Sequence, residues 1–419
     1  MSPSVVQIVA VVLFALALIH TFSTKYFEHL AHTRPAHAGV WHLLAEVEIV
    51  FGVWAMLFML LMSLLVGRTE ALAYLDRQNF TEPLFVFVIM AVAGSRPVLQ
   101  AVTAGVQAFV RLVPLPRTMA FFFTALAIVP LLGSFITEPA AMTLAALLMK
   151  DTVFARASTR LKYAALGVLF VNVSIGGTLT PFAAPPVLMV AGKWGLDIAY
   201  MLGHIGWKAA LAVTINAGML TWLFRRELRL MAYSAKSPYS GVPRWMMALH
   251  VLFMVGIVAL SHHPAAFLAI FLLFMGIATA YPAFQDRLLL REGLLVGFFL
   301  GGLVVLGGMQ QWWLQPLLMS MNDTSVYFGT TALTAITDNA ALTYLGSLVE
   351  GLSDEFKYAL LTGAVTGGGL TIIANAPNPA GASILKGTFD EGSIAPLHLF
   401  LGALGPTLVA ILCFRLLPW

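Results

Sequence analysis

Apolar runs long enough to cross a lipid bilayer recur along this chain from its first residues to its last. A helix needs about 18 to 20 largely apolar residues to span the hydrocarbon core. Ten runs reach or approach that length: 4–22, 41–66, 84–110, 163–190, 198–224, 245–261, 264–281, 290–309, 358–380 and 393–417. The pattern predicts an all-α polytopic membrane protein with about ten transmembrane helices.

The amino-acid composition excludes most classes of soluble protein. Of the 419 residues, 60% are hydrophobic and only 10% are charged, whereas a soluble domain has about a quarter of its residues charged. The chain cannot cover a soluble globule of this size with polar surface, so we expect its partner to be the lipid bilayer and not nucleic acid. Cys413 is the single cysteine, so no disulfide framework can form within one chain.

Two further apolar stretches, 118–149 and 312–350, are interrupted at their centres by polar, helix-breaking sequence. The interruptions read Gly133-Ser-Phe-Ile-Thr-Glu-Pro139 and Thr334-Ala-Ile-Thr-Asp-Asn339. Each stretch then has two halves that are too short to span a membrane alone. Irregular backbone at membrane depth survives only where protein or a water-filled cavity satisfies its polar groups, so we expect two re-entrant hairpins.

The distribution of Lys and Arg predicts the orientation of the chain, because cytoplasmic loops carry an excess of these residues. If the polar segment 225–244 is a cytoplasmic linker and both hairpins re-enter from their own side, sixteen of the 23 basic residues lie inside. This placement accounts for the net charge of +4 without an anionic partner. It also places both ends of the chain outside.

The predicted helices repeat with inverted orientation. Residues 1–224 contain three helices, the hairpin 118–149 and two helices, and residues 245–419 contain three helices, the hairpin 312–350 and two helices. Three motif pairs recur in the same order: Thr137-Glu-Pro-Ala-Ala-Met-Thr143 with Thr337-Asp-Asn-Ala-Ala-Leu-Thr343, Lys162-Tyr-Ala-Ala-Leu with Lys357-Tyr-Ala-Leu-Leu, and Gly176-Gly-Thr-Leu-Thr-Pro with Gly367-Gly-Gly-Leu-Thr-Ile. Inverted repeats with interrupted segments in corresponding places are typical of secondary transporters that bind substrate at the midmembrane.

Glu138 and Asp338 are the strongest candidates for a binding site, since each lies at the break of a hairpin. An ionisable group at membrane depth is costly unless it is paired, hydrated or bound to an ion. With Thr137, Thr337 and Asn339 beside them, the two carboxylates suit exchange of Na⁺ or protons, and both are candidate Na⁺ ligands. The alternative is that the tips protrude from the membrane, where an acidic residue caps a helix.

The interrupted segments that follow the hairpins supply a second layer of candidates. Gly permits an unwound backbone and Pro removes an intrahelical hydrogen bond, which leaves polar groups for a ligand. The candidate side chains in these segments are Asn172, Ser174, Thr178, Thr180, Thr371, Asn375 and Asn378. Alternatively, the small residues here serve close helix packing.

Three other charged residues inside apolar runs, Glu46, Arg96 and Lys208, are candidates for proton coupling. Lys208 would compete with an ion for a carboxylate; the alternative is that all three form structural ion pairs between helices. No Gly-Lys-Ser/Thr sequence follows a Walker A spacing, which argues against an ATP-driven pump. We expect no cofactor and no enzymatic activity, with Na⁺ and H⁺ as the transported ions.

The polar hairpin tips and the Gly176-Gly-Thr-Leu-Thr-Pro segment resemble the ion transporter superfamily, which includes NhaD-type sodium/proton antiporters, arsenite exporters and dicarboxylate/sodium symporters. Within it, the chain is similar over nearly its whole length to a family of bacterial Na⁺/H⁺ antiporters. The resemblance implies a scaffold part and a transport part in each half, and hairpins that meet near the midmembrane. It also implies a homodimer that moves its transport part like an elevator in the bacterial inner membrane.

Two transport hypotheses follow. The leading one is antiport of Na⁺ or Li⁺ against H⁺ by alternating access, with Glu138 and Asp338 alternating between protonated and cation-bound states. The alternative on the same fold is proton-coupled export of an anion or weak acid, such as a carboxylate or arsenite. Acidic tips stand where the dicarboxylate branch has Ser-Asn-Thr, and they would repel a dicarboxylate. A membrane scaffold or enzyme that retains a transporter fold is a third class, which an accessory domain or a catalytic triad would favour; neither is visible in the sequence.

Overall fold

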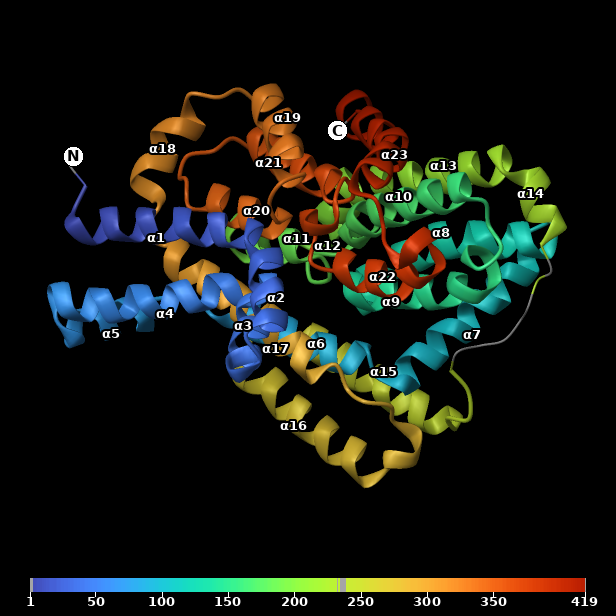
Figure 1. Ribbon diagram of the computed structural model, residues 1–419, viewed down its shortest axis with the longest axis horizontal. Coiled ribbons are helices and arrows are strands. Elements are labelled where there is room, and N and C mark those ends of the chain that lie inside the picture. The colour runs from blue at the N-terminus through green and yellow to red at the C-terminus, as the bar shows by residue number, and fades with distance from the viewer. Residues whose placement is uncertain (1–2, 232, 234–238, 419) are drawn as a thin grey trace. The chain divides into compact units, whose positions relative to one another are not determined.

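The computed structural model describes residues 3–231, 233 and 239–418, and helices make up every regular element among them (Figure 1). Seven segments are long and apolar enough to cross a membrane. They are α1 (Val5–Phe22), α4 (Val47–Val66), α8 (Arg117–Ile136), Thr159–Leu179 with α10 (Thr159–Gly176), Ile198–Leu223 with α13 (Trp207–Leu223), α17 (Leu290–Gly307) and α23 (Pro396–Leu416). The chain is therefore an all-α polytopic membrane protein, as its composition predicts.

The remaining predicted spans take other forms. α6 (Thr81–Ala93) and α7 (Arg96–Leu112) are long enough together but bend by 67° at their junction. α15 (Arg244–Ala259) and α16 (Pro264–Ala280) are apolar but shorter, and α21 (Asp354–Gly367) has 14 residues. By length and composition the described residues hold seven spans, or eight if the bent pair is one span, so the count of ten stays a prediction.

The other helices are short. They are α2 (Thr24–Thr33), α3 (Ala38–Leu44), α5 (Arg68–Asp76), α9 (Glu138–Met149), α11 (Pro185–Trp194), α12 (Ile198–Tyr200), α14 (Arg225–Leu230), α18 (Gln311–Met319), α19 (Asp323–Thr334), α20 (Asn339–Ser347) and α22 (Asn378–Leu385). The predicted linker 225–244 begins with α14, and its residues 232 and 234–238 lie outside the described part of the chain.

The first hairpin differs from the expectation in one respect: its first half is not too short to span a membrane. α8 has 20 residues because it continues through Gly133, where the interruption was expected to begin, as far as Ile136, and it contains Pro130. Proline cannot donate to the carbonyl four residues earlier, which is that of Leu126. Asn172 of α10 replaces the missing donor, since its Nδ2 lies 2.7 Å from the Leu126 carbonyl oxygen. An interhelical side chain thus stabilises a helix that the sequence suggests is broken.

The chain forms two compact units. Unit 1 comprises 1–87, 290–321 and 344–352, and unit 2 comprises 88–289, 322–343 and 353–419. Each unit takes segments from both predicted repeats, so the units are not the repeats themselves. The division into inverted repeats at 1–224 and 245–419 stays a prediction.

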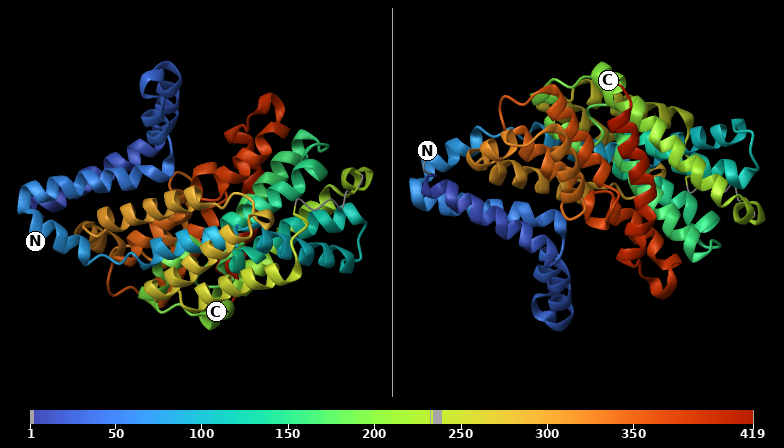
Figure 2. Two further views of the ribbon diagram at one scale, coloured as in Figure 1. Left: turned by 90° about the horizontal axis from the view of Figure 1, so that it is seen from below. Right: turned by 90° about the horizontal axis from the view of Figure 1, so that it is seen from above.

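Unit 1 is built around the contact of α4 with α17. The two helices approach so closely at Gly302 that a Cβ there would overlap the backbone of Phe51 and Gly52, and Phe51 packs edge-on against Phe299. α2 and α3 turn sharply away from α1 (Figure 2). His20 joins these elements, because one ring nitrogen pairs with the Leu44 carbonyl and the other accepts from the indole N–H of Trp54.

Unit 2 is centred on α10, the most completely buried of the long apolar segments. α8, α13 and α23 surround it (Figure 1). Backbones come close where side chains are absent: a Cβ at Gly167 would overlap Gly402 of α23, and one at Gly369 would overlap Val171. Small residues therefore set the interhelical distances, as is common in membrane proteins.

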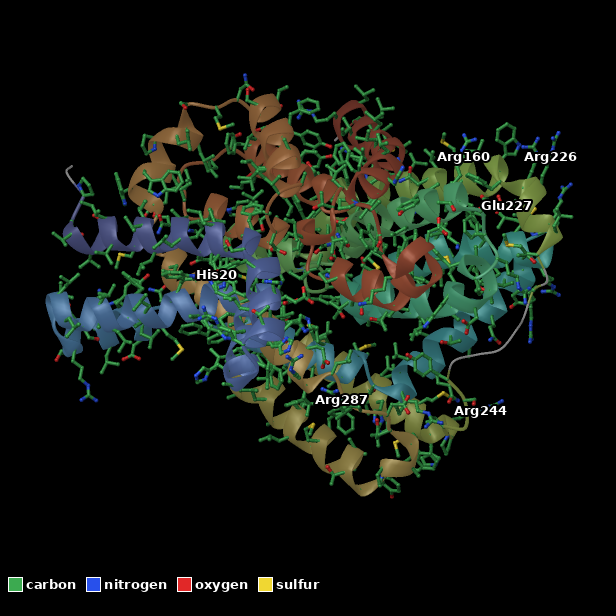
Figure 3. All side chains as sticks on the ribbon, viewed as in Figure 1. His20, Arg160, Arg226, Glu227, Arg244 and Arg287 are labelled. Carbon is green, nitrogen blue, oxygen red and sulfur yellow. The ribbon has the colours of Figure 1, made fainter. Side chains whose placement is uncertain are left out.

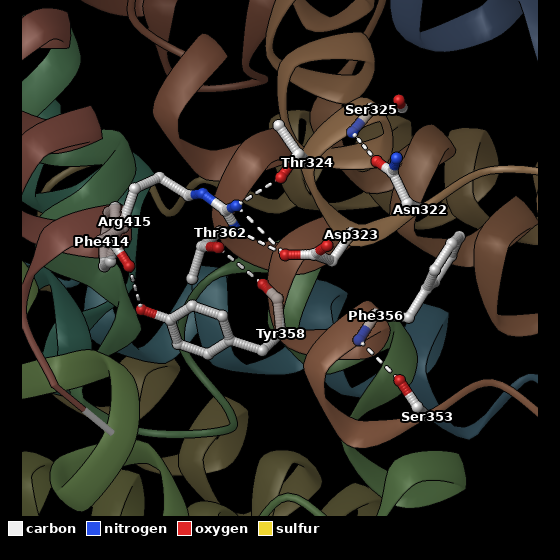
Figure 4. A network of polar contacts seen from close by, with 10 residues as sticks. All are labelled: Asn322, Asp323, Thr324, Ser325, Ser353, Phe356, Tyr358, Thr362, Phe414 and Arg415. Carbon is white, nitrogen blue, oxygen red and sulfur yellow. Dashed lines mark hydrogen bonds and ion pairs between the residues drawn. The ribbon is translucent and has the colours of Figure 1, made fainter.

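The matching Lys-Tyr motifs hold opposite ends of α23. Tyr163, near the start of α10, accepts a hydrogen bond from the Ala395 amide just before α23 (3.0 Å). Tyr358, near the start of α21, donates to the Phe414 carbonyl in the last turn of α23 (2.9 Å) (Figure 4). α10 and α21 therefore begin at opposite ends of the same helix.

The close approach at Gly302 generates a stability prediction with a neighbouring control. Gly302→Ala should lower the free energy of unfolding by about 1–3 kcal/mol through overpacking. Gly301→Ala should be neutral or slightly stabilising, because its Cβ would meet the Phe80 ring at an ordinary 3.7 Å and Ala favours helix over Gly. Thermal unfolding of both variants in detergent checks this, and equal stability of the two would contradict the packing described.

Candidate cation site

The first helix break is a sharp turn in the backbone at Thr137. α8 ends at Ile136, α9 begins at Glu138, and Thr137 between them has φ +75°, the one positive φ outside glycine among the described residues. A threonine before a helix usually caps it by accepting from the second or third amide. Here the second residue is Pro139, which has no amide hydrogen, and the Thr137 hydroxyl makes no capping bond.

Glu138 is the first residue of α9 and is completely buried. Its Oε2 accepts a hydrogen bond from Asn375 Nδ2 at 2.8 Å, whereas its Oε1 has no hydrogen-bond partner. Gly177 leaves space for this carboxylate, because a Cβ there would lie 2.5 Å from Oε1. The first helix break therefore meets two other interrupted segments. Glu138 contacts Gly177 in the segment after α10 and Asn375 in the segment after α21.

Ser134 fixes the backbone of the break after α10. Its hydroxyl donates to the Gly176 carbonyl (2.7 Å) and accepts from the Leu179 amide (2.9 Å). Thr180 donates to the Ser134 carbonyl, and Thr178 donates to the Ile175 carbonyl at 2.7 Å. The predicted site residues Thr178 and Thr180 thus stabilise the unwound segment with their hydroxyl protons, while Ser134 was not predicted from the sequence.

The break after α21 is held by two asparagines and a threonine. Asn378 Nδ2 donates to the carbonyls of Gly368 and Thr371, both at 2.8 Å. Thr371 in turn donates to the Ala335 carbonyl at 2.8 Å, which connects this segment to the end of α19. Asn375 lies between them, where it reaches Glu138. The predicted residues Thr371, Asn375 and Asn378 therefore do come together.

Asp338 occupies a different position from Glu138. It precedes α20, and its Oδ1 accepts from the amides of Ala340 (2.8 Å) and Ala341 (3.2 Å). Asp338 is half-buried, as is Thr337, and its charge interacts unfavourably with that of Glu138. Asp338 is thus a helix cap, the alternative function that the sequence allowed for both acids, whereas Glu138 is not.

Asn339 extends the site toward α10. It is fully buried, and its Nδ2 lies 3.5 Å from Ser174 Oγ. Ser174 itself donates to the Val365 carbonyl at 2.7 Å. A Cβ at Gly368 would collide with Ser174 and approach Asn339 Nδ2 to 2.9 Å, so the missing side chain of Gly368 makes this contact possible.

Five buried oxygen atoms at these breaks have no hydrogen-bond partner among the described residues. They are Thr137 Oγ1, Glu138 Oε1, Asn339 Oδ1, Asn375 Oδ1 and Asn378 Oδ1. Buried polar atoms are normally paired, and hard cations are bound by carboxylate and amide oxygens. In the described part of the chain no group of three or more His, Cys, Asp or Glu is placed to hold a metal ion, so a cation here would depend largely on neutral oxygens.

Residues 5–417 match the family described as "Putative Na+/H+ antiporter". The chain belongs to this family. No curated protein matches the sequence. Membership makes the protein an antiporter-type transporter of the membrane, for cations and protons. The five unpartnered oxygens at the breaks of unit 2 therefore belong to a cation/proton transporter.

Other predicted residues of this antiporter lie apart from Glu138 or have other partners. Asn172 donates to the carbonyls of Leu126 and Val213 and accepts from Asn216, so its polar groups connect α8, α10 and α13. Lys208 is buried in α13, where its Nζ donates to the Tyr358 hydroxyl at 3.0 Å. No carboxylate of the described residues forms an ion pair with it.

The remaining two candidates for proton coupling form ion pairs at helix ends. Arg96 begins α7 and pairs with Asp286 at 3.4 Å in unit 2. Glu46 precedes α4 and pairs with Arg291 of α17 in unit 1. Both lie at helix starts and not inside a continuous helix, contrary to the expectation from the sequence. α4 begins only at Val47, and the run 84–110 is divided between α6 and α7 just before Arg96. These contacts are structural ion pairs between helices, which is the alternative to proton coupling that the sequence analysis gave.

The strained backbone at Thr137 yields a prediction about stability. Thr137→Gly should raise the free energy of unfolding by about 1 kcal/mol or more, since Gly adopts positive φ without steric cost. Thr137→Ala is the matched control: it removes the same hydroxyl but keeps the strain. Chemical unfolding in detergent should rank Gly above Thr and Ala, and an Ala variant as stable as the Gly variant would show that strain is not the cause.

Proposed function

We propose that the protein exchanges Na⁺ for H⁺ at Glu138. The supporting observation is the unpartnered Oε1 of this fully buried carboxylate among other unpartnered oxygens. An isolated charge at membrane depth is costly, so either a proton or a cation must neutralise Glu138. Both neutralise the same group, and their binding is therefore mutually exclusive. Mutual exclusion at one buried carboxylate is sufficient to couple the two fluxes.

The chemistry of the site supports a cation over an anion. All five unpartnered atoms are oxygens, and the amide nitrogens of Asn375 and Asn378 are engaged by Glu138 and by backbone carbonyls. A carboxylate or arsenite-like anion would need hydrogen-bond donors and would be repelled by Glu138 and Asp338. Export of an anion or weak acid, as in the arsenite exporter branch, remains the alternative, and NhaD-type cation antiport is our preference.

The two acids have different roles in this mechanism. Two backbone amides stabilise the ionised form of Asp338 at the start of α20, so we assign it a constant negative charge that favours cations. Glu138 has one neutral amide as its hydrogen-bond partner, and it alone changes between protonated and cation-bound states. One proton then exchanges for one Na⁺.

The movement that exposes the site alternately to each side is also part of the proposal. Glu138, Asp338 and both interrupted segments belong to unit 2, and each unit combines segments of both halves of the chain. This division suits a transport part in unit 2 and a scaffold in unit 1. By the resemblance to elevator-type relatives, we propose a homodimer in the bacterial inner membrane whose transport parts move.

Exchange in proteoliposomes tests the role of Glu138. With a pH-sensitive dye inside, an imposed Na⁺ gradient should move protons in the unmodified protein, and Glu138→Gln should reduce this to the background of empty vesicles. Asp338→Asn keeps the helix cap but removes the charge that favours cations, so it should raise the Na⁺ concentration needed for half-maximal exchange and still leave proton movement above that background. Glu350→Gln, an exposed acid in unit 1, is the control. Absence of proton movement in the unmodified protein would refute antiport, and an inactive Asp338→Asn would assign exchange to both acids.

The one-to-one mechanism predicts electroneutral exchange. In vesicles with a K⁺ gradient and valinomycin, an imposed membrane potential should leave the initial rate of Na⁺-driven proton movement unchanged. If both acids released protons for each Na⁺, one net charge would cross per cycle, and a potential of 100 mV would contribute about 2.3 kcal/mol to the driving force. A clear dependence of the initial rate on potential would therefore contradict the assignment to Glu138 alone.

A further inference from the structure

A group of arginines lies at the end of unit 2 where α13 meets α14. We call it the arginine patch and define it as Arg160, Arg225, Arg226 and Arg229. Arg160 and Arg226 lie near each other beside Glu227, and Arg244 and Arg287 lie well apart from them (Figure 3). The transport mechanism at Glu138 does not use this patch.

The carboxylate of Glu227, which lies beside Arg160 and Arg226, is already occupied (Figure 3). Glu227 Oε1 accepts from the Ser158 amide at 2.6 Å, and Oε2 accepts from the Ser158 hydroxyl at 3.0 Å. Ser158 is the N-cap of α10, so Glu227 joins α14 to the start of α10 and brings Arg160 beside Arg226. The four arginines of the patch outnumber this engaged carboxylate, which leaves an excess of positive charge.

Arg225 is held in place on an aromatic ring. Its guanidinium carbon lies 4.5 Å from the centre of the Trp222 ring, and Nη1 donates to the Trp222 carbonyl at 2.9 Å. Such stacking restricts the side chain and leaves its other donors in a fixed plane. A planar guanidinium of this kind recognises phosphate through paired hydrogen bonds, so the patch has a preorganised donor.

The surroundings of the patch are apolar and exposed. Trp222 is 64% exposed, Leu223 57%, Met219 60% and Leu230 89%. Met219, Trp222 and Leu223 end the apolar segment Ile198–Leu223, and Leu230 ends α14. At such a position a membrane-spanning helix meets the interface, where Trp and Arg are common. A soluble anion would gain nothing from this rim, whereas a lipid would place acyl chains against it.

We infer that the arginine patch binds the phosphodiester of an anionic phospholipid of the phosphatidylglycerol class. The headgroup phosphate pairs with Arg225 and Arg226, and the acyl chains lie along the exposed face at Met219 and Leu223. A zwitterionic lipid fits less well, because its own ammonium offsets the charge that the arginines attract. Lipid binding relieves the repulsion among the arginines and thereby stabilises the α10–α13–α14 junction that Glu227 joins.

Thermal unfolding in nanodiscs tests this inference. The full-length protein should unfold a few degrees higher in discs with about a third phosphatidylglycerol than in pure phosphatidylcholine, as expected for a ligand that binds the folded state. The double variant Arg225→Gln with Arg226→Gln should lose that shift. The matched control Arg244→Gln with Arg287→Gln removes the same charge elsewhere in unit 2 and should keep it.

Three outcomes would overturn the inference. The first is an unmodified protein whose unfolding temperature does not change with the anionic lipid. The second is a control pair that loses the shift as fully as the patch pair, and the third is a shift that inorganic phosphate reproduces in phosphatidylcholine discs. The second would show a general effect of charge, and the third a site for soluble anions. If the patch pair fails to fold, Arg225→Lys with Arg226→Lys keeps the charge but removes the planar donors, and it should retain less than half of the shift. None of these outcomes depends on Na⁺/H⁺ exchange.

Discussion

The hydrogen bond between Asn375 and Glu138 is the constraint that organises unit 2, because it joins the break of the first hairpin to the interrupted segment of the second half. A buried carboxylate must have a partner. Here Oε2 of Glu138 accepts a hydrogen bond from the neutral side-chain amide of Asn375, whereas Oε1 and the other oxygens at the breaks have no hydrogen-bond partner. Glu138 has room at this position only because Gly177, in the segment after α10, has no side chain. The packing of glycine against carboxylate is therefore a condition for the site and not an incidental feature of it.

The breaks themselves depend on side chains that replace lost backbone hydrogen bonds. Ser134 pairs with both Gly176 and Leu179, Asn378 pairs with Gly368 and Thr371, and Asn172 pairs with the carbonyl that Pro130 leaves free. In the low-dielectric interior an unsatisfied backbone group costs several kcal/mol. Unwound backbone at this depth is therefore stable only because these polar side chains are placed against it.

The sequence predicts the fold class, the two breaks, and Glu138, Asn375 and Asn378, because polar residues between Gly and Pro are conspicuous in an apolar chain. It does not predict Ser134, since a serine inside a helix commonly bonds its own backbone and gives no sign of a distant partner. Asn172 and Asn375 look alike in sequence, yet one supports helix packing and the other reaches the carboxylate. The difference lies in non-local contacts. The length of α8 was underestimated for the same reason, because the helix continues from Gly133 to Ile136, where Ser134 pairs with the distant segment after α10.

The two hairpin tips have similar sequences, Thr-Glu-Pro and Thr-Asp-Asn, but the helix begins at the acid in the first and one residue later in the second. An acid just before a helix bends back onto its amides, whereas an acid in the first position of the helix cannot reach them as readily. Pro139 reinforces this difference by removing one amide hydrogen from α9. A shift of one residue in the start of a helix thus separates a structural carboxylate from one that is available to a proton or a cation. The two tips are therefore alike in sequence, while in the exchange that we propose only Glu138 carries the exchanging group.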